Sequence, residues 1–355
     1  MSELSPSSPA HDAELSAYAR LVRRRIVLIG ALCLLMTAAM LFDIATGPSN
    51  LPLSDVLTGI LHPGALDAPS RVIIWDVRLP YALMATLVGA ALALAGAEMQ
   101  TILNNPLASP FTLGVSSAAS FGAALALVMG LSLPLLPVGW NLPVFAFILA
   151  FGSVLLLQML ASLRGTGVET LVLFGIALVF TFNALVALVQ FVATQEALQQ
   201  LVFWSMGSLA RATWDKLGVL ALVLLATTPF SLAASWRMTA LRLGEDRARS
   251  FGISVRRLRF LALLRVSLLA ATSVAFVGTI GFIGLVAPHI ARLLVGEDHR
   301  FFLPASMLTG AAIMSLASVA SKTLVPGALL PVGIVTALIG VPFFVVLVFS
   351  RRERL

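Results

Sequence analysis

Charged side chains are scarce in this chain of 355 residues, since only 11% of the sequence is Asp, Glu, Lys or Arg. A typical soluble domain carries about 25% charged residues, and a water-soluble protein of this length needs them to cover its surface. Hydrophobic residues make up 59% of the sequence, and the mean hydropathy is +1.01. The composition excludes a soluble globular protein and a disordered chain, and it predicts an integral membrane protein.

Cysteine is scarcer still, because Cys33 is the single cysteine. One thiol cannot form an internal disulfide, so a disulfide scaffold is excluded. The sequence also lacks the Gly-X-Y and heptad repeats of collagen and coiled coils. What it has instead is long continuous apolar runs, for example over residues 26–45 and 142–163.

Sequence signatures of enzymes are missing too. There is no G-x-x-x-x-G-K-[ST] phosphate loop, no H-E-x-x-H and no G-x-S-x-G. The four histidines have no metal-ligand spacing; they are His11, His62, His289 and His299. We therefore expect no catalytic residue, no metal site and no bound cofactor in this chain.

The apolar runs predict an all-α membrane protein. Only helices and closed barrels satisfy every backbone N–H and C=O group in lipid, and a barrel strand would show alternating polarity over about ten residues. A spanning helix needs about 20 apolar residues, which predicts about ten transmembrane helices. We place them near residues 26–46, 79–99, 113–131, 142–162, 170–192, 216–235, 259–279, 281–295, 303–325 and 331–350.

The predicted organisation is one polytopic domain over residues 26–350. A polar, basic stretch over residues 1–25 is interpreted as a flexible cytoplasmic tail, and residues 351–355 form a short cytoplasmic end. The eighth span is the weakest, because it is short and three glycines interrupt it between residues 278 and 284. We expect a tilted or broken helix there.

The distribution of Lys and Arg predicts the orientation. If the N-terminus is cytoplasmic, most of the 23 Lys and Arg residues fall in inner segments and few in outer ones. The positive-inside rule then places both termini in the cytoplasm and favours an even number of crossings. The basic charge thus reflects topology, and no nucleic-acid partner is expected.

Two predicted segments outside the membrane are long enough to have a role. The outer one, residues 47–77, is expected to be periplasmic and to contain a short helix from Ser54. The inner one, residues 236–258, carries Glu245 and Asp246 among several arginines and between two glycines. We interpret it as two short helices on the cytoplasmic face, with a plain basic loop as the alternative.

Polar groups inside the spans are few. Glu98 and Arg265 are ionisable, and each is expected to reach the inner interface or to pair there; a proton relay at Glu98 is the alternative. Asn183 and Gln190 are seven residues apart and share one helix face. That face is expected to meet either a cavity or a neighbouring helix.

Small residues are dense in the second span. Gly89, Ala93 and Gly96 follow one another at helical spacing. This small-xxx-small pattern lets helix backbones approach closely, so we expect tight helix packing along this face.

Several segments resemble the FecCD-type permeases, the membrane subunits of ABC importers for ferric siderophores, haem and cobalamin. The resemblance covers most of the chain after residue 75, in the family's order. It rests on RLPYALMATLVGAALALAGAEMQTILNNPLASPFTLGVSSAASFGA (78–123), LFGIALVFTFNALVALVQF (173–191), FWSMGSLARATW (203–214), LGEDRARSFGISVRRLR (243–259), VAFVGTIGFIGLVAPHIARLLVGEDHR (274–300) and LPVGIVTALIGVPFFVVLV (330–348).

The resemblance implies an architecture and a set of partners. It implies ten helices with both termini inside, in the inner membrane of a bacterium, and a dimer with a second copy or a homologous permease. Two separate ATPase subunits would use ATP and Mg, and a periplasmic binding protein would deliver the solute. The missing phosphate loop agrees with such a division of labour.

The resemblance also implies roles for individual residues. The inner segment matches the ATPase-coupling loop, which implicates Gly244, Glu245, Asp246, Ala248, Gly252 and Arg256. For docking of the binding protein it implicates Arg78 and Lys322, the latter at a position where an arginine is common, whereas Tyr81 stands where a second arginine often occurs. For the translocation pathway it implicates Asn183, Gln190 and Trp204.

The sequence leaves the solute open. A ferric siderophore is favoured, because it is the commonest substrate class of the family, and haem or cobalamin are the alternatives. A secondary transporter driven by an ion gradient is the competing class. An intramembrane enzyme or a purely structural subunit is a third, but it would need a nucleophile or metal pair that the sequence does not show.

Overall fold

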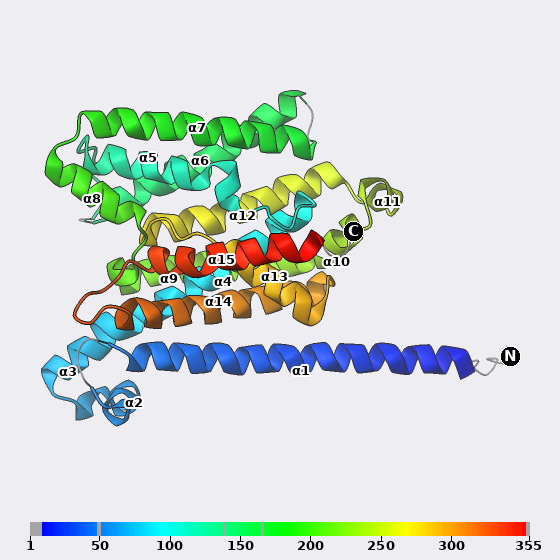
Figure 1. Ribbon diagram of the computed structural model, residues 1–355, viewed down its shortest axis with the longest axis horizontal. Coiled ribbons are helices and arrows are strands. Elements are labelled where there is room, and N and C mark those ends of the chain that lie inside the picture. The colour runs from blue at the N-terminus through cyan, green and yellow to red at the C-terminus, as the bar shows by residue number, and fades with distance from the viewer. Residues whose placement is uncertain (1–8, 48–50, 138, 165–166, 353–355) are drawn as a thin grey trace.

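The computed structural model describes residues 9–47, 51–137, 139–164 and 167–352, and within these ranges every regular element is a helix. The long helices lie side by side in one bundle (Figure 1). In chain order the elements are α1 (Pro9–Ala45), α2 (Leu53–Leu61), η1 (Pro63–Ala65), α3 (Ala68–Val72), η2 (Ile73–Arg78), α4 (Leu79–Ile102), η3 (Pro110–Leu113), α5 (Val115–Leu127), α6 (Asn141–Arg164), α7 (Val168–Phe191), α8 (Gln195–Ser205), η4 (Leu209–Arg211), α9 (Trp214–Ala233), α10 (Ser235–Leu241), α11 (Glu245–Ser250), α12 (Val255–Val277), α13 (Ile283–Val295), α14 (His299–Thr323) and α15 (Val332–Arg352).

Seven of these helical segments are long and apolar enough to cross a membrane by length and composition. They contain α1, α4, α6, α7, α9, α12 and α14, and the shorter apolar helices lie in α5, α13 and α15. Each of the ten predicted spans overlaps one of these helices. The all-helical membrane fold is therefore confirmed, while the number of complete crossings stays a prediction.

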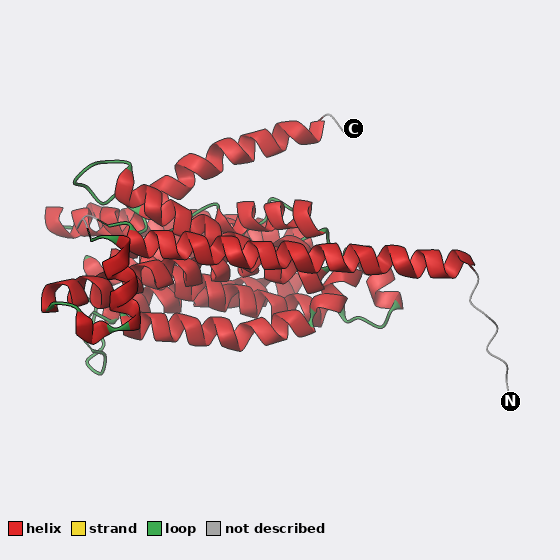
Figure 2. Cartoon of the chain, turned by 90° about the horizontal axis from the view of Figure 1, so that it is seen from below, coloured by secondary structure: helices red, strands yellow, loops and turns green. Residues whose placement is uncertain are grey.

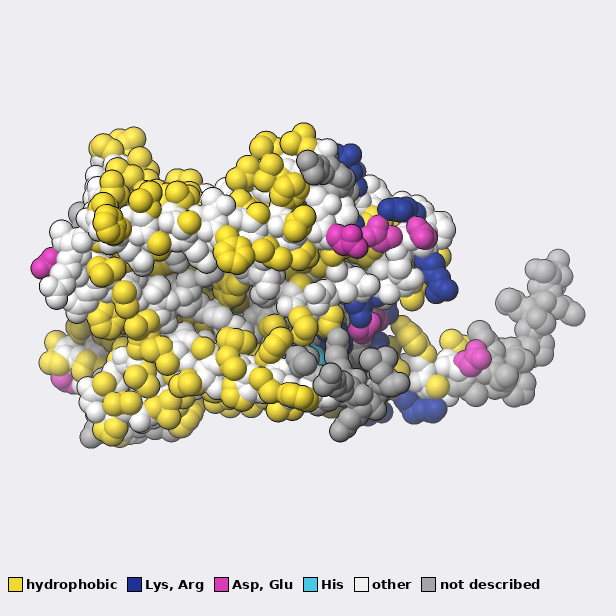
Figure 3. Space-filling model, turned by 45° about the horizontal axis from the view of Figure 1, so that its top comes forward, with side chains coloured by type: hydrophobic (Ala, Val, Ile, Leu, Met, Phe, Trp, Pro, Cys, Tyr) yellow, Lys and Arg dark blue, Asp and Glu magenta, His cyan; other side chains and the backbone are white. Residues whose placement is uncertain are grey.

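The two ends of the bundle differ. The start of α1, the end of α15 and α11 lie at one end, which we call the α11 end, and α2, α3 and α8 lie at the other, the α2 end (Figure 1). Having the first and last helices begin and end on the same side agrees with an even number of crossings. Acidic and basic side chains gather at the α11 end, and apolar ones cover the flank between the ends (Figure 3).

The N-terminal prediction is wrong for residues 9–25, which form the first turns of α1 rather than a flexible tail. The segment is rich in Ala and Arg, which favour helix, and it contains no proline or glycine after Pro9. The apolar helix therefore continues outward, beyond the rest of the bundle (Figure 2). Residues 1–8 and 353–355 lie outside the described part of the chain.

The outer segment 47–77 is more helical than expected. Its first helix, α2, begins at Leu53, one residue before the predicted start, and η1, α3 and η2 follow. The indole of Trp75 donates a hydrogen bond of 2.9 Å to the carbonyl of Gly59 and thereby folds the segment back on itself. Residues 48–50 of this segment lie outside the described residues.

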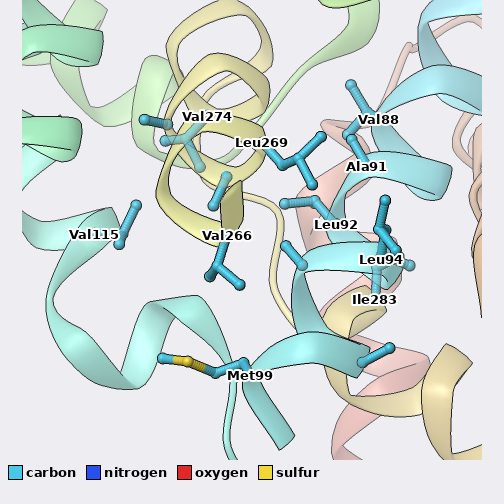
Figure 4. Packing of buried hydrophobic residues seen from close by; sticks show 14 of the residues in the cluster. Val88, Ala91, Leu92, Leu94, Met99, Val115, Val266, Leu269, Val274 and Ile283 are labelled. Atoms are coloured by element: carbon cyan, nitrogen blue, oxygen red, sulfur yellow. The ribbon is translucent and has the colours of Figure 1, made fainter. Parts of the chain in front are cut away.

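The core is built around α4, which is buried along nearly its whole length. Val88 and Leu92 of α4 lie toward Leu269 of α12, whereas Leu94 lies on the other side of α4, beside Ile283 of α13 (Figure 4). Burial on all sides explains why α4 has no polar face outside its ends.

The predicted close packing of small residues is confirmed. A Cβ atom on Gly89 would overlap the carbonyl of Gly310 in α14, and one on Gly96 would overlap the carbonyl of Gly284 in α13. At both positions the obstacle is backbone, so only glycine allows the approach.

The eighth predicted span is short, as expected. α13 has 13 residues, which gives a length of about 20 Å, against a hydrocarbon core of about 30 Å. It is preceded by Gly278 with a φ of 80° and Phe282 with a φ of 68°. These left-handed conformations break the chain between α12 and α13.

Candidate functional site

The predicted coupling segment forms a shaped surface at the α11 end. Its two short helices are α10 and α11, and Gly244 starts α11 with a φ of 106°, which favours glycine. We define the α11 surface as the exposed part of residues 242–257. Within it Asp246, Gly252 and Arg256 are exposed, whereas Ala248 is fully buried beneath α11.

Glu245 fixes this surface to the bundle. Its carboxylate forms an ion pair with Arg259 of α12 and a second one, of 3.0 Å, with Arg249 of α11. The Arg259 side chain is only 6% exposed, and its Nε donates a hydrogen bond of 3.0 Å to the carbonyl of Ile102 at the end of α4. A force applied to α11 therefore reaches both α12 and α4 through hydrogen bonds that involve charged groups.

A second network joins the same surface to α13 and α14. Arg242 donates from Nε to Glu297 at 3.0 Å and from Nη1 to Asn104 at 2.9 Å, and Arg292 lies 3.4 Å from the Glu297 carboxylate. Burial raises the pKa of Glu297, but hydrogen bonding to Arg242 and the charges of Arg242 and Arg292 outweigh it, so that the pKa lies below its usual 4.5. Arg292 also donates to Gln100 of α4 at 2.9 Å.

Deeper in the bundle, Glu98 and Arg265 pair with each other. Arg265 donates to the carboxylate from Nε, at 3.0 and 3.1 Å, and from Nη2, at 2.8 Å. The Glu98 side chain is 0% exposed, and that of Arg265 is 11% exposed. The expectation that each would find a partner is confirmed, and the partner of each is the other residue.

The two predicted docking residues at the α2 end are both held within the chain. The Lys322 ammonium donates to the Asp43 carboxylate at 2.7 Å and lies 4.5 Å from the centroid of the Tyr81 ring. Arg78 is 4% exposed and donates to the carbonyls of Ile44 and Ala45 at the end of α1. Both cationic side chains therefore connect α1 to other helical segments of this chain.

Of the three predicted pathway residues, Trp204 borders a cavity at the α2 end. Trp204 of α8 is 1% exposed and borders a cavity of about 300 Å³ together with Arg211, Gln199 and Gln200. Trp204 Nε1 and Arg211 Nη1 are buried and have no hydrogen-bond partner within the described residues. Burial also lowers the pKa of Arg211. Two residues of the lining thus carry buried donors without a partner within the described residues.

Asn183 and Gln190 do not join Trp204 in that pocket. Asn183 is exposed and Gln190 half-buried on α7. A second cavity, of about 620 Å³, lies against α15 and is lined by Ser205 at the end of α8, Thr279 and Gly333, among others. The helix α8 therefore contributes residues to both cavities.

Comparison with known proteins shows which family has a sequence like this one. The sequence model of the FecCD transport family matches residues 34–350. This chain belongs to the FecCD transport family. The hemin transport system permease protein HmuU of Yersinia pestis is 39% identical to this FecCD protein, over 79% of the chain and 84% of HmuU. The molybdate import system permease protein MolB of Haemophilus influenzae is 36% identical, over 91% of the chain and 94% of MolB.

A solved structure supports the same assignment. An ABC transporter of the metal-chelate type, in an inward-facing conformation, matches the FecCD protein with a TM-score of 0.79 and 36% identity, over 91% of this chain and 99% of that one. The protein is an ABC importer permease and a multi-pass membrane protein. In such importers ATP hydrolysis belongs to separate subunits, and the names of the relatives cover different solutes.

Some site residues of the FecCD permease were missed in the sequence. Arg242 lies 55 residues from Glu297 along the chain, so spacing gave no signal for the network that it forms with Glu297 and Arg292. Arg211 looked like an ordinary loop cation. Two exposed aromatic residues, Trp236 and Phe251, were detectable as large apolar residues within a polar segment. Their ring centroids lie 6.4 Å apart beside α11. Among the described residues no group of three or more His, Cys, Asp or Glu forms a metal-binding cluster.

Proposed function

We propose that this FecCD permease passes a ferric siderophore from a periplasmic binding protein to the cytoplasm, through the interface of a permease dimer driven by two ATPase subunits. The observation that carries the proposal is the α11 surface. It presents exposed charge on a short helix that Glu245 ties to α12 and, through Arg259, to α4. Such an element transmits the motion of a docked partner to the spans instead of absorbing it.

We place the α11 end, with both termini, in the cytoplasm of a bacterial inner membrane. The positive-inside bias supports this orientation. Cysteine labelling tests it, with Cys33 replaced by Ser and single cysteines introduced at Arg247 in α11 and at Leu57 in α2. In right-side-out vesicles a membrane-impermeant maleimide is expected to label position 57 but not position 247, and the reverse pattern would overturn the proposal.

The pathway is assigned to α8 and its surroundings. The two cavities beside α8, of about 300 and 620 Å³, support a role for this helix as an outer gate. Their size lies within the range of small-molecule sites, about 300–1,000 Å³. Haem or cobalamin are the alternative solutes, and MolB adds a molybdate importer to the family's relatives.

A gradient-driven carrier is the second candidate, and the buried Glu98–Arg265 pair favours it, because ionisable groups in spans often relay protons. Reconstituted vesicles separate the two. We expect uptake only when the ATPase, the binding protein and ATP are present. Uptake that follows a proton or sodium gradient without ATP would replace the importer proposal.

A further inference from the structure

A cavity of about 440 Å³ lies between α6, α7 and α12 at the α11 end. Its lining includes Gln158 and Ser162 of α6, Leu171 of α7, and Arg256, Arg257 and Leu263 of α12. Arg259, which ties α11 to α12 and α4, also lines this cavity. Gln158 and Ser162 take no part in those contacts, so the contacts of α11 do not account for the polar groups of α6 in the lining.

The polar interior of this cavity is unsatisfied. Gln158 is only 9% exposed, and its buried Nε2 and Oε1 atoms both lack a hydrogen-bond partner within the described residues. Buried amides are rarely left in this condition in native proteins. An amide can donate and accept at once, so it fits a ligand that has both ester or hydroxyl oxygens and a donor.

The rest of the lining is both basic and apolar. Arg256 and Arg257 of α12 are exposed. The lining also includes the apolar side chains of Leu155, Met159 and Phe260, which are 41%, 56% and 49% exposed. This flank belongs to the apolar surface of the bundle, and the charged groups begin only at its α11 end (Figure 3).

We propose that the cavity binds an anionic phospholipid from the membrane leaflet at the α11 end. The lipid phosphate pairs with Arg256 and Arg257, the glycerol and ester oxygens reach the Gln158 amide, and an acyl chain lies along Leu155, Met159 and Phe260. Basic pockets between transmembrane helices are a known setting for anionic headgroups. A free phosphate would leave the apolar rim without a role, and therefore a lipid is the occupant.

Native mass spectrometry of the full-length protein in detergent tests this proposal. With equal amounts of phosphatidylglycerol and phosphatidylcholine added, we expect phosphatidylglycerol to be retained preferentially. Arg257→Gln is expected to weaken its retention by roughly tenfold, the effect of losing one hydrogen bond to a charged group, and Gln158→Leu by about fivefold, the effect of losing one hydrogen bond between neutral groups. Arg247→Gln removes the same charge from α11, outside the cavity, and is expected to leave retention unchanged.

The remaining outcomes are equally decisive. Displacement of the lipid by millimolar inorganic phosphate alone would identify a phosphate site and overturn the lipid proposal. Equal retention of both lipids, or unchanged retention in Gln158→Leu, would overturn it as well. If Gln158→Leu does not fold, Gln158→Glu keeps the size of the side chain, and its added negative charge is expected to expel the lipid. None of these outcomes depends on which solute the importer carries.

Discussion

Arg265 of α12 donates hydrogen bonds from its Nε and Nη2 atoms to the fully buried carboxylate of Glu98 in α4. The pair joins two central helices of the bundle, and Leu92 of α4 also lies beside Leu269 of α12 (Figure 4). Both charges are removed from water, so each must be compensated by the other. Loss of either partner would leave the other charge buried without its counter-charge.

We expect each single neutralisation of this pair to be costly. Glu98→Gln leaves the Arg265 guanidinium buried without its counter-charge, and removing one partner of a buried ion pair destabilises by about 3–5 kcal/mol. The double variant Glu98→Leu, Arg265→Met replaces both charges by apolar groups and is expected to be more stable than either single variant. Thermal unfolding in detergent measures all three, and a double variant less stable than both singles would contradict the prediction.

The same pair shows what sequence reasoning reaches and where it stops. Hydropathy alone located the long helices of the described chain. Backbone groups in lipid must be hydrogen-bonded within a helix, and the thickness of the bilayer sets the length of a spanning helix, so a long apolar run predicts a helix directly. It also flagged Glu98 and Arg265 as unusual. It did not pair them, since 167 residues separate them and a distant contact leaves no spacing signal in one sequence.

The docking residues show a second limit. Lys322 and Arg78 were singled out by resemblance, and their charge suggested a surface. Both side chains are buried because they contact Asp43 and the end of α1. These contacts join residues that are distant in sequence, and no local sequence pattern indicates them. The prediction of a flexible tail over residues 9–25 was wrong for a related reason. The polar composition was taken to indicate flexibility, although the residues there are good helix formers.

Asp246 and Glu245 are expected to behave differently although they are adjacent. The Asp246 side chain is 99% exposed, so Asp246→Lys is expected to impair the coupling of ATP hydrolysis to transport while leaving the unfolding temperature unchanged. Glu245→Lys also breaks the ion pair with Arg259 and is expected to lower that temperature. ATPase assays in proteoliposomes with the partner subunits measure coupling. Normal transport by Asp246→Lys would remove it from the coupling surface.

Glu297 predicts an acid-sensitive contact at the α11 end. Its pKa in the folded protein lies below the usual 4.5 because Arg242 and Arg292 outweigh the effect of burial. A carboxylate with a lowered pKa stabilises the folded state at pH values above its unfolded pKa, and this stabilisation is lost as the pH falls through the folded pKa. Stability is thus expected to decline as the pH drops below about 4.5.

The control for this pH dependence is Glu297→Gln, which keeps the shape of the side chain but does not titrate. Its unfolding temperature is expected to be lower than that of the unmodified protein at pH 7 and to approach it at pH 4. The His299 side chain and the arginines nearby are the other charged or titratable groups that act on Glu297. An unchanged difference between the two proteins from pH 7 to pH 4 would exclude the Glu297 contact as the cause.

Lys322 is expected to matter for stability before it matters for docking. Its side chain is 6% exposed and bonded to Asp43 and to the carbonyl of Thr46. Lys322→Met leaves the buried Asp43 carboxylate without its counter-charge, although Ser318 still donates to it, and the loss of one partner of a buried ion pair costs about 3–5 kcal/mol. The affinity of the folded variant for its binding protein, measured by surface plasmon resonance, is expected to stay within about twofold, or about 0.4 kcal/mol. A large loss of affinity with normal stability would contradict this prediction and support the docking role.

The approach of α4 to α13 gives the sharpest test of the fold. Gly96→Ala places a methyl group onto the backbone carbonyl of Gly284, and because backbone cannot rotate away, α13 must shift. Overpacking of this kind costs about 1–3 kcal/mol, so the unfolding temperature is expected to fall. Gly30→Ala in α1 is the matched control, since no atom lies within 4 Å of the added Cβ and alanine favours helix by up to about 1 kcal/mol. If both variants melt like the unmodified protein, α4 and α13 do not meet at Gly96 as the structure has them.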